Sequence, residues 1–123
     1  MRLLCLFLLS VILFSACHQQ KKATTAFIKE EKFQKELQEK FILTEDGGTI
    51  ELPEGNFMLS KSLSMEGKKN ITIKGKGVGK TILSFLGQTE GGEGINVTNC
   101  NNITIENFTI QDAKGDNLKL KGC

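Results

Sequence analysis

The chain has 123 residues, with 16 basic and 14 acidic side chains, a net charge of +2 and four cysteines. This length allows one domain with a modest core. The charge is nearly balanced and the chain has neither tryptophan nor tyrosine. A nucleic-acid-binding role therefore has little support, since it needs a basic surface and stacking side chains. One histidine and no Cys-x-x-Cys motif give no support for a transition-metal site of the usual nitrogen and sulfur type.

Residues 1–16 have the pattern of a lipoprotein signal peptide. Arg2 supplies the positive start, and 3–14 form an apolar run too short to span a bilayer. Residues 14–17, Phe-Ser-Ala-Cys, match the site where bacterial signal peptidase II cuts and the cysteine is acylated. The alternative is an ordinary secretory signal in which Cys17 is incidental. We therefore expect a cell-envelope protein that is anchored to the membrane by lipid on Cys17.

The residue after Cys17 bears on the choice of membrane. In the enterobacterial sorting rule, an aspartate at that position retains a lipoprotein at the inner membrane, whereas this chain has His18. By that analogy the expected location is the outer membrane of a diderm bacterium. Residues 17–25 are polar and are predicted to be the lipidated tether that holds the domain off the membrane surface.

Residues 26–45 are predicted to contain an amphipathic helix. Phe33, Leu37 and Phe41 recur every four residues, while lysine and glutamate fill the other positions. A helix with such a stripe can cover the first coil of a solenoid, so a capping role is predicted. Binding to the membrane surface is the alternative, and the balanced charge of the polar face disfavours it.

From residue 46 to 123 the hydrophobic period changes to two, which predicts short strands joined by Gly, Asn and Pro turns. In segment 81–86 the inward pair is ambiguous between Ile82 with Ser84 and Leu83 with Phe85. The other predicted inward pairs are Ile50 and Leu52, Phe57 and Leu59, Leu63 and Met65, Ile71 and Ile73, Ile95 and Val97, Ile103 and Ile105, Phe108 and Ile110, and Leu118 and Leu120.

An internal repeat sets the expected register of these strands. Segment 63–74 aligns without a gap on 95–106, and the block Asn-Ile-Thr-Ile is identical in both copies. A third copy begins at Leu118, which makes the first complete coil nine residues longer than the next. Such repeats of short strands are typical of solenoids. We assign most of the nine extra residues to the loop 87–94.

Three strands to each coil predict three stacks of strands. The predicted stacks lie near residues 63, 95 and 118, near 50, 71 and 103, and near 57, 82–85 and 108. Each connection from a strand of the third stack to the next strand of the first stack would then lie on the same side of the solenoid.

Two kinds of residue occupy equivalent positions in successive coils. Asn70 and Asn102 precede equivalent strands, where a sharp corner needs a left-handed residue whose amide can bond its counterpart in the next coil. A structural corner role is predicted for both. Cys100 and Cys123 are also one coil apart, and a coil spacing of ~4.8 Å allows a disulfide. Stacking of small apolar side chains at a turn is the favoured interpretation.

Residues 48–57, Gly-Thr-Ile-Glu-Leu-Pro-Glu-Gly-Asn-Phe, resemble the opening coil of the right-handed parallel β-helix superfamily, that of pectate lyases and their relatives. Residues 70–83 continue the likeness, which runs from about residue 30 to the end. With the repeats, the resemblance implies an all-β fold. The expected fold is a right-handed parallel β-helix of about two to three coils over 46–123, incomplete at its C-terminus, with a capping helix at 26–45.

The resemblance implies contact with a polysaccharide. The superfamily includes polysaccharide lyases, C5-epimerases and members without known catalysis. Pectate lyases of this fold use Ca²⁺ bound by acidic residues and an arginine base, but Arg2 is the only arginine here, so no catalytic residue transfers by motif. We expect a surface lipoprotein that binds a polysaccharide or belongs to a lyase or epimerase. The alternative is a non-catalytic periplasmic or envelope scaffold that contacts protein partners.

Two loops carry the candidate ligand-binding residues, which are Gln88, Glu90 and Glu93 in one loop and Asp112, Asp116 and Asn117 in the other. Both loops are expected on the same side of the solenoid, about one coil apart. Their carboxylates and amides suit sugar hydroxyls, and Asp112 and Asp116 are candidate Ca²⁺ ligands. The competing interpretation is that these are solvated turns, where Asp and Asn are favoured in any case.

The stack of strands ends near 118–120 with an unpaired edge and no polar cap, which invites edge-to-edge association. We therefore predict that segment 18–123, taken by itself, is marginally folded or self-associating. Sedimentation and thermal unfolding test this prediction, and a sharp unfolding transition of a monomer would contradict it.

Overall fold

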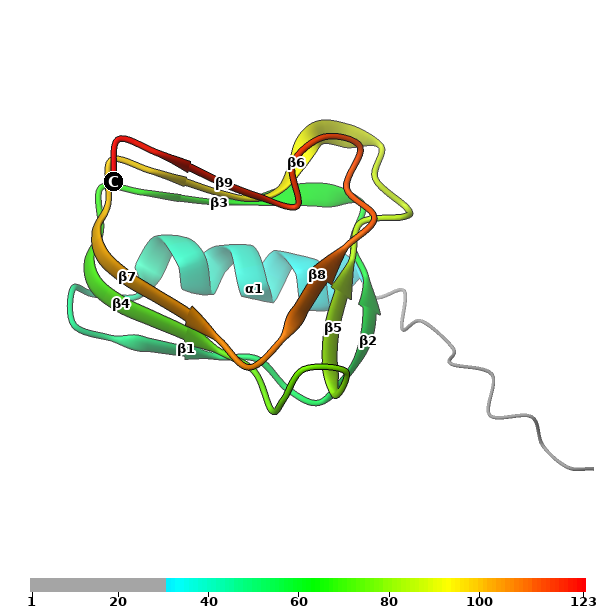
Figure 1. Cartoon of the computed structure of the whole chain (residues 1–123), viewed down its shortest axis with the longest axis horizontal. Helices are drawn as coiled ribbons and strands as arrows, with labels where there is room; N and C mark the ends of the chain where they lie inside the picture. Colours follow the sequence, from blue (N-terminus) through cyan, green and yellow to red (C-terminus); the bar gives the residue numbers. More distant parts are fainter. Residues whose placement is uncertain (1–30) are drawn as a thin grey trace, which may run out of the picture.

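The computed structural model of the chain describes residues 31–123 (Figure 1). The predicted signal segment, Cys17, the tether and the first five residues of the predicted capping helix lie outside these residues. No helix between residues 31 and 123 is long and apolar enough to cross a membrane. The elements are α1 (Glu31–Leu43), β1 (Thr49–Glu51), β2 (Gly55–Met58), β3 (Lys61–Glu66), β4 (Lys69–Lys74), β5 (Thr81–Ser84), β6 (Glu90–Thr98), β7 (Asn101–Glu106), β8 (Thr109–Gln111) and β9 (Leu118–Lys121).

The strands form three sheets of three, in the orders β1-β4-β7, β2-β5-β8 and β3-β6-β9, and every pairing is parallel. The three predicted stacks are therefore confirmed. The repeat also predicted the register, since Leu63 pairs with Ile95 and Ile71 pairs with Ile103. In Figure 1 the sheets form three sides around a common interior, and α1 lies across it. The architecture is a β-helix-like stack of parallel coils.

The interior of the first two coils is filled by the predicted inward pairs. Leu83 and Phe85 are the inward residues of the ambiguous segment. Ser84 is also buried, because its hydroxyl donates a hydrogen bond to Asp112 in the next coil at 2.8 Å. The buried apolar side chains of the strands and turns are Ile50, Leu52, Phe57, Leu59, Leu63, Met65, Ile71, Ile73, Leu83, Phe85, Ile95, Val97 and Cys100.

The extra residues of the longer coil are divided between two places, which corrects the prediction. The offset between paired residues is 32 at Ile71 and Ile103, 27 at Ile82 and Thr109, and 23 at Ile95 and Leu118. Five of the nine extra residues therefore lie in the turn 75–80, and four lie between β5 and the paired part of β6. The turn is held by Thr81, whose hydroxyl accepts from the Lys76 N–H and donates to the Pro53 carbonyl.

Left-handed residues turn the chain at the same corners of successive coils. Asn70 and Asn102 both have φ of 55°, and the Asn102 side-chain amide donates to the Asn70 amide oxygen at 2.7 Å. A second column of left-handed residues contains Gly67, Asn99 and Gly122. Glycine and asparagine adopt this conformation at the lowest cost, which explains why they occupy these corners.

Helix α1 covers the first coil with its apolar stripe. Leu37 and Phe41 are buried in the common core, as the helical period predicted. The Phe33 ring stacks on the Phe57 ring of β2 with a centroid distance of 4.0 Å. Burying these side chains removes from water the apolar surface that the first coil would otherwise expose.

Two glutamines of α1 pair with the backbone at the free edge of β3. The Gln34 amide accepts from the Ser60 N–H at 2.8 Å and donates to the Lys61 carbonyl at 3.3 Å. One helical turn later, the Gln38 amide accepts from and donates to Ser64, both at 2.9 Å. These side chains supply the hydrogen bonds that another strand would supply, so α1 closes the edge as well as the core.

We predict that Phe41→Ala lowers the free energy of unfolding by about 3–5 kcal/mol, because the ring is fully buried beneath α1. The control is Ile42→Ala at the next position, where the side chain is 57% exposed and the expected change is within about 0.5 kcal/mol. Denaturant titrations of both variants make the comparison. Equal effects would contradict the capping role of this helix face.

Candidate functional site

The two predicted loops lie on the same side of the molecule, as expected from their places in the coils. The Gly94 N–H donates to the Asp116 carbonyl and the Ile95 N–H donates to the Asn117 carbonyl, both at 2.9 Å. The Gly115 N–H donates to the Gly92 carbonyl at 2.6 Å. Residues 90–94 of the predicted first loop belong to β6, so Glu90 and Glu93 lie on a strand and not in a loop, which corrects the prediction. In Figure 1 this part of β6 projects together with the connection between β8 and β9. We call residues 87–94 and 112–117 together the loop stack.

Gln88 braces the loop stack from inside. Its side chain is only 4% exposed, and its amide donates to the Glu93 carbonyl at 2.8 Å and to the Ser62 hydroxyl at 3.1 Å. The amide oxygen accepts from the Lys114 N–H at 3.3 Å. Since these bonds use the buried amide and link all three coils, the position of Gln88 fits a structural role better than the predicted ligand-binding role.

Glu90 and Glu93 each form an ion pair with a lysine of the third sheet. Glu93 accepts from the Lys119 ammonium group at 2.9 Å, while Glu90 lies 3.7 Å from Lys61. The hydrogen bond from Lys119 lowers the pKa of Glu93, with help from backbone N–H groups. The same bond, with the Glu93 charge, raises the pKa of Lys119. The two pairs place alternating charges across successive coils on one side of the molecule.

The three predicted residues of the second loop are all exposed, and they differ in their hydrogen bonds. Asp112 accepts from the Ser84 hydroxyl and from the Gln111 amide at 3.1 Å, and Asn117 accepts from the Ala113 N–H at 3.0 Å. Asp116 is exposed. Within residues 31–123, no group of three or more His, Cys, Asp or Glu side chains is placed to hold a metal ion. The predicted Ca²⁺ ligands therefore have no third acidic side chain beside them in this part of the chain.

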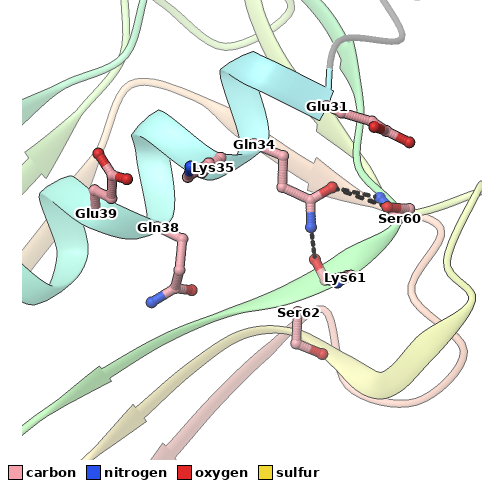
Figure 2. Close-up of a pocket in the computed structure, with 8 residues that line it drawn as sticks. All are labelled: Glu31, Gln34, Lys35, Gln38, Glu39, Ser60, Lys61 and Ser62. Atoms are coloured by element: carbon pink, nitrogen blue, oxygen red, sulfur yellow. Dashed lines mark hydrogen bonds between the residues drawn. The ribbon is translucent and has the colours of Figure 1, made fainter.

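A groove of about 530 Å³ runs between α1 and β3 and is lined by long side chains with polar ends. Figure 2 shows Gln34 reaching across the groove to Ser60 and Lys61, with Lys35 and Glu39 farther along the helix. No ligand-binding role was predicted for this face of α1 from the sequence. The lining residues are Glu31, Gln34, Lys35, Gln38, Glu39, Ser60, Lys61 and Ser62.

A smaller pocket of about 240 Å³ shares Glu31, Gln34, Ser60 and Lys61 with the groove and reaches Gly87 and Thr89 of the loop stack. The Thr89 N–H donates to the Ser60 carbonyl at 2.8 Å, and the Ser62 hydroxyl donates to the Glu93 carbonyl at 2.5 Å. The result is one polar surface that runs from α1 across all three coils. We call this surface the loop flank, and its charged residues are Glu31, Lys35, Glu39, Lys61, Glu90, Glu93, Asp116 and Lys119.

Comparisons with protein-family models, with curated proteins and with solved structures found no match for this chain. The side chains of the loop flank are therefore the evidence for the kind of ligand that it can bind. Its carboxylates accept hydrogen bonds, its ammonium groups donate them, and its hydroxyls do both. Such a surface, shallow and mixed in charge, suits a polar ligand with many hydroxyl groups.

We predict a pH-dependent effect of Glu93→Gln on the Tm. Because the pKa of Glu93 is lowered from its ordinary value of 4.5, the carboxylate stabilises the fold above that pH and loses this effect as the pH falls through the lowered pKa. The Tm difference from the native chain should be constant between about pH 5 and 7 and vanish in more acidic solution. Glu66→Gln, an exposed site of β3, is the control. A difference unchanged at acidic pH would contradict the ion pair.

Proposed function

We propose that this protein is a lipid-anchored envelope protein whose right-handed, pectate lyase-like β-helix binds a polysaccharide along the loop flank. The observation that carries the proposal is that the groove beside α1 shares residues with a second pocket, which reaches the loop stack. A polymer of repeating sugars needs a long, shallow surface with repeating polar groups. Coils spaced by ~4.8 Å supply such a surface.

The resemblance to pectate lyases, and not the charge of the loop flank, favours an acidic polysaccharide with many free hydroxyl groups. The loop flank carries more acidic than basic side chains, and two of its lysines are paired with glutamates. Lys35 and Lys61 would pair with uronate carboxylates, while Glu31 and Glu90 would accept hydrogen bonds from sugar hydroxyls. Pectate and alginate belong to this chemical class. Asp116 would contribute to a Ca²⁺-bridged contact with such a polymer if further oxygen ligands come from the sugar.

The cellular setting of the proposal rests on sequence patterns. Acylation at Cys17 would hold the domain at the membrane, and the adjacent His18 supports the outer membrane. A right-handed coil agrees with the strong preference of parallel strand connections for that hand. A lyase or epimerase activity belongs to the same proposal. The lyase reaction is tested by the absorbance of unsaturated uronate when pectate or alginate is incubated with the protein and Ca²⁺.

Affinity gel electrophoresis tests the binding directly. The full chain should be retarded in gels that contain pectate or alginate, and the double variant Lys61→Gln with Glu90→Gln should lose most of that retardation. These side chains form an exposed pair on the loop flank, so their removal should change the surface without disturbing the core.

The control is a second exposed pair, Lys74 and Glu51, which lies on the sheet β1-β4-β7 with its charged groups 3.5 Å apart. The double variant Lys74→Gln with Glu51→Gln has the same change of charge and should keep full retardation. Equal losses from both double variants, or no retardation of the native chain on any acidic polymer, would contradict the proposal.

Within residues 31–123, the outer face of the third coil supports a second candidate function, that of a scaffold that contacts proteins. Each of β7, β8 and β9 is the last strand of its sheet. Leu118 and Leu120 of β9 are 37% and 56% exposed, and inward residues of β7 are only partly buried. An apolar end with unpaired strand edges favours contact with other strands, including those of a second copy.

Sedimentation velocity over a range of concentrations tests this second function. We expect self-association that Leu120→Lys weakens several-fold, because the substitution places a charge on the exposed end. The control is Leu86→Lys, since Leu86 is similarly exposed at 65% but lies between β5 and β6, away from the end of the stack. A native chain that stays monomeric at high concentration would contradict this alternative.

A further inference from the structure

The two cysteines of the described residues have the same environment, one coil apart. Val97 pairs with Leu120 and Thr98 pairs with Lys121. The same offset of 23 residues relates Cys100 to Cys123, which lie just beyond these paired strands. Each thiol contacts the carbonyl two residues before it in its own coil, at 3.3 Å for Cys100 and 3.7 Å for Cys123. Each also faces a carbonyl of the preceding coil. Both thiols are free in this structure.

The positions of the two residues suit a covalent bond between coils. Neighbouring strands lie ~4.8 Å apart, within the Cα separation of about 4.4–6.8 Å found in disulfides. The Cys123 sulfur lies 3.6 Å from the Val97 carbonyl, so it already points toward the coil that carries Cys100. The Cys100 sulfur is turned the other way, toward the Lys68 N–H at 3.4 Å. Rotation about its χ1 angle breaks only weak sulfur contacts.

We propose that Cys100 and Cys123 form a disulfide site that fastens the last coil to the one before it. The ring closed by this bond spans residues 100–123 and contains β7, β8 and β9, the last strand of every sheet. Closing the ring restricts the unfolded chain and so stabilises the coil at the exposed end of the stack. Secretion to the cell envelope, which is part of the proposed function, supplies the oxidising setting that such bonds require.

The exposure of the two thiols determines which of them reacts first with a disulfide reagent. Cys123 is exposed while Cys100 is 3% exposed, so a disulfide reagent reacts first at Cys123. With oxidised glutathione, the Cys123 thiolate forms a mixed disulfide and releases one glutathione. The Cys100 thiolate then attacks the Cys123 sulfur and releases the second glutathione. The two cysteines together give up two electrons and two protons as the sulfur–sulfur bond forms. Oxidised glutathione takes up both and becomes two glutathione thiols.

Peptide mapping of the full chain in detergent tests the proposal. The chain is incubated with oxidised glutathione at mildly alkaline pH, blocked with an alkylating reagent and digested with trypsin. Cleavage after lysine releases Cys100 in peptide 81–114 and Cys123 in peptide 122–123. We expect these peptides to be joined, with a mass two hydrogens below their sum. This peptide pair distinguishes the bond from any that involves Cys5 or Cys17.

A second readout is thermal stability. The oxidised chain should have a Tm about 5–15 °C above that of the reduced chain, and a reductant should reverse the gain. Cys123→Ser is the control, because it alters an exposed side chain, and its Tm should not respond to the reductant. Separately alkylated cysteines, a lasting mixed disulfide on Cys123, or a Tm that ignores the reductant would overturn the proposal. The loop flank contains neither cysteine, so failure of polysaccharide binding leaves this result unaffected.

Discussion

The pairing of helix α1 with the free edge of β3 is the interaction on which the rest of the structure depends. A strand edge exposes N–H and C=O groups that bind other strands. Gln34 and Gln38 lie one helical turn apart and satisfy these groups at Ser60, Lys61 and Ser64. The same helix buries Leu37 and Phe41 against the first coil. One helix therefore satisfies the free edge of β3 and also covers the core of the first coil. The parallel strands are stacked from this covered end.

This arrangement makes the molecule asymmetric along its stack, and the polar surface follows from the asymmetry. At the covered end, the groove forms because α1 is held against β3 at a distance set by two amide side chains. From there, Ser62 and the buried Gln88 connect β3 to the loop stack. At the other end, β7, β8 and β9 have no further strand paired with them among residues 31–123. Polar binding and strand contact are thus proposed for different parts of the molecule.

Local repetition explains which features could be predicted from the sequence. The repeated Asn-Ile-Thr-Ile block predicted strand register, because a shift by one residue would turn isoleucines outward. The pairing role of Gln34 and Gln38 has no such pattern, since glutamine is common on helix surfaces. Gln88 was predicted as a ligand-binding residue, but burial by a neighbouring loop directs its amide inward. The extra length of the turn 75–80 was missed because its glycines are typical of any bend.

Amide hydrogen exchange tests the central claim most directly. If α1 closes the edge of β3, the N–H groups of Ser60 and Ser64 are bonded to glutamine side chains and should exchange slowly, much like the core amide of Leu52. Amides of β9, at the uncovered end, should exchange sooner. Rapid exchange at Ser60 and Ser64 together with slow exchange in β9 would contradict the account, since it would mean that the stack is organised from its other end.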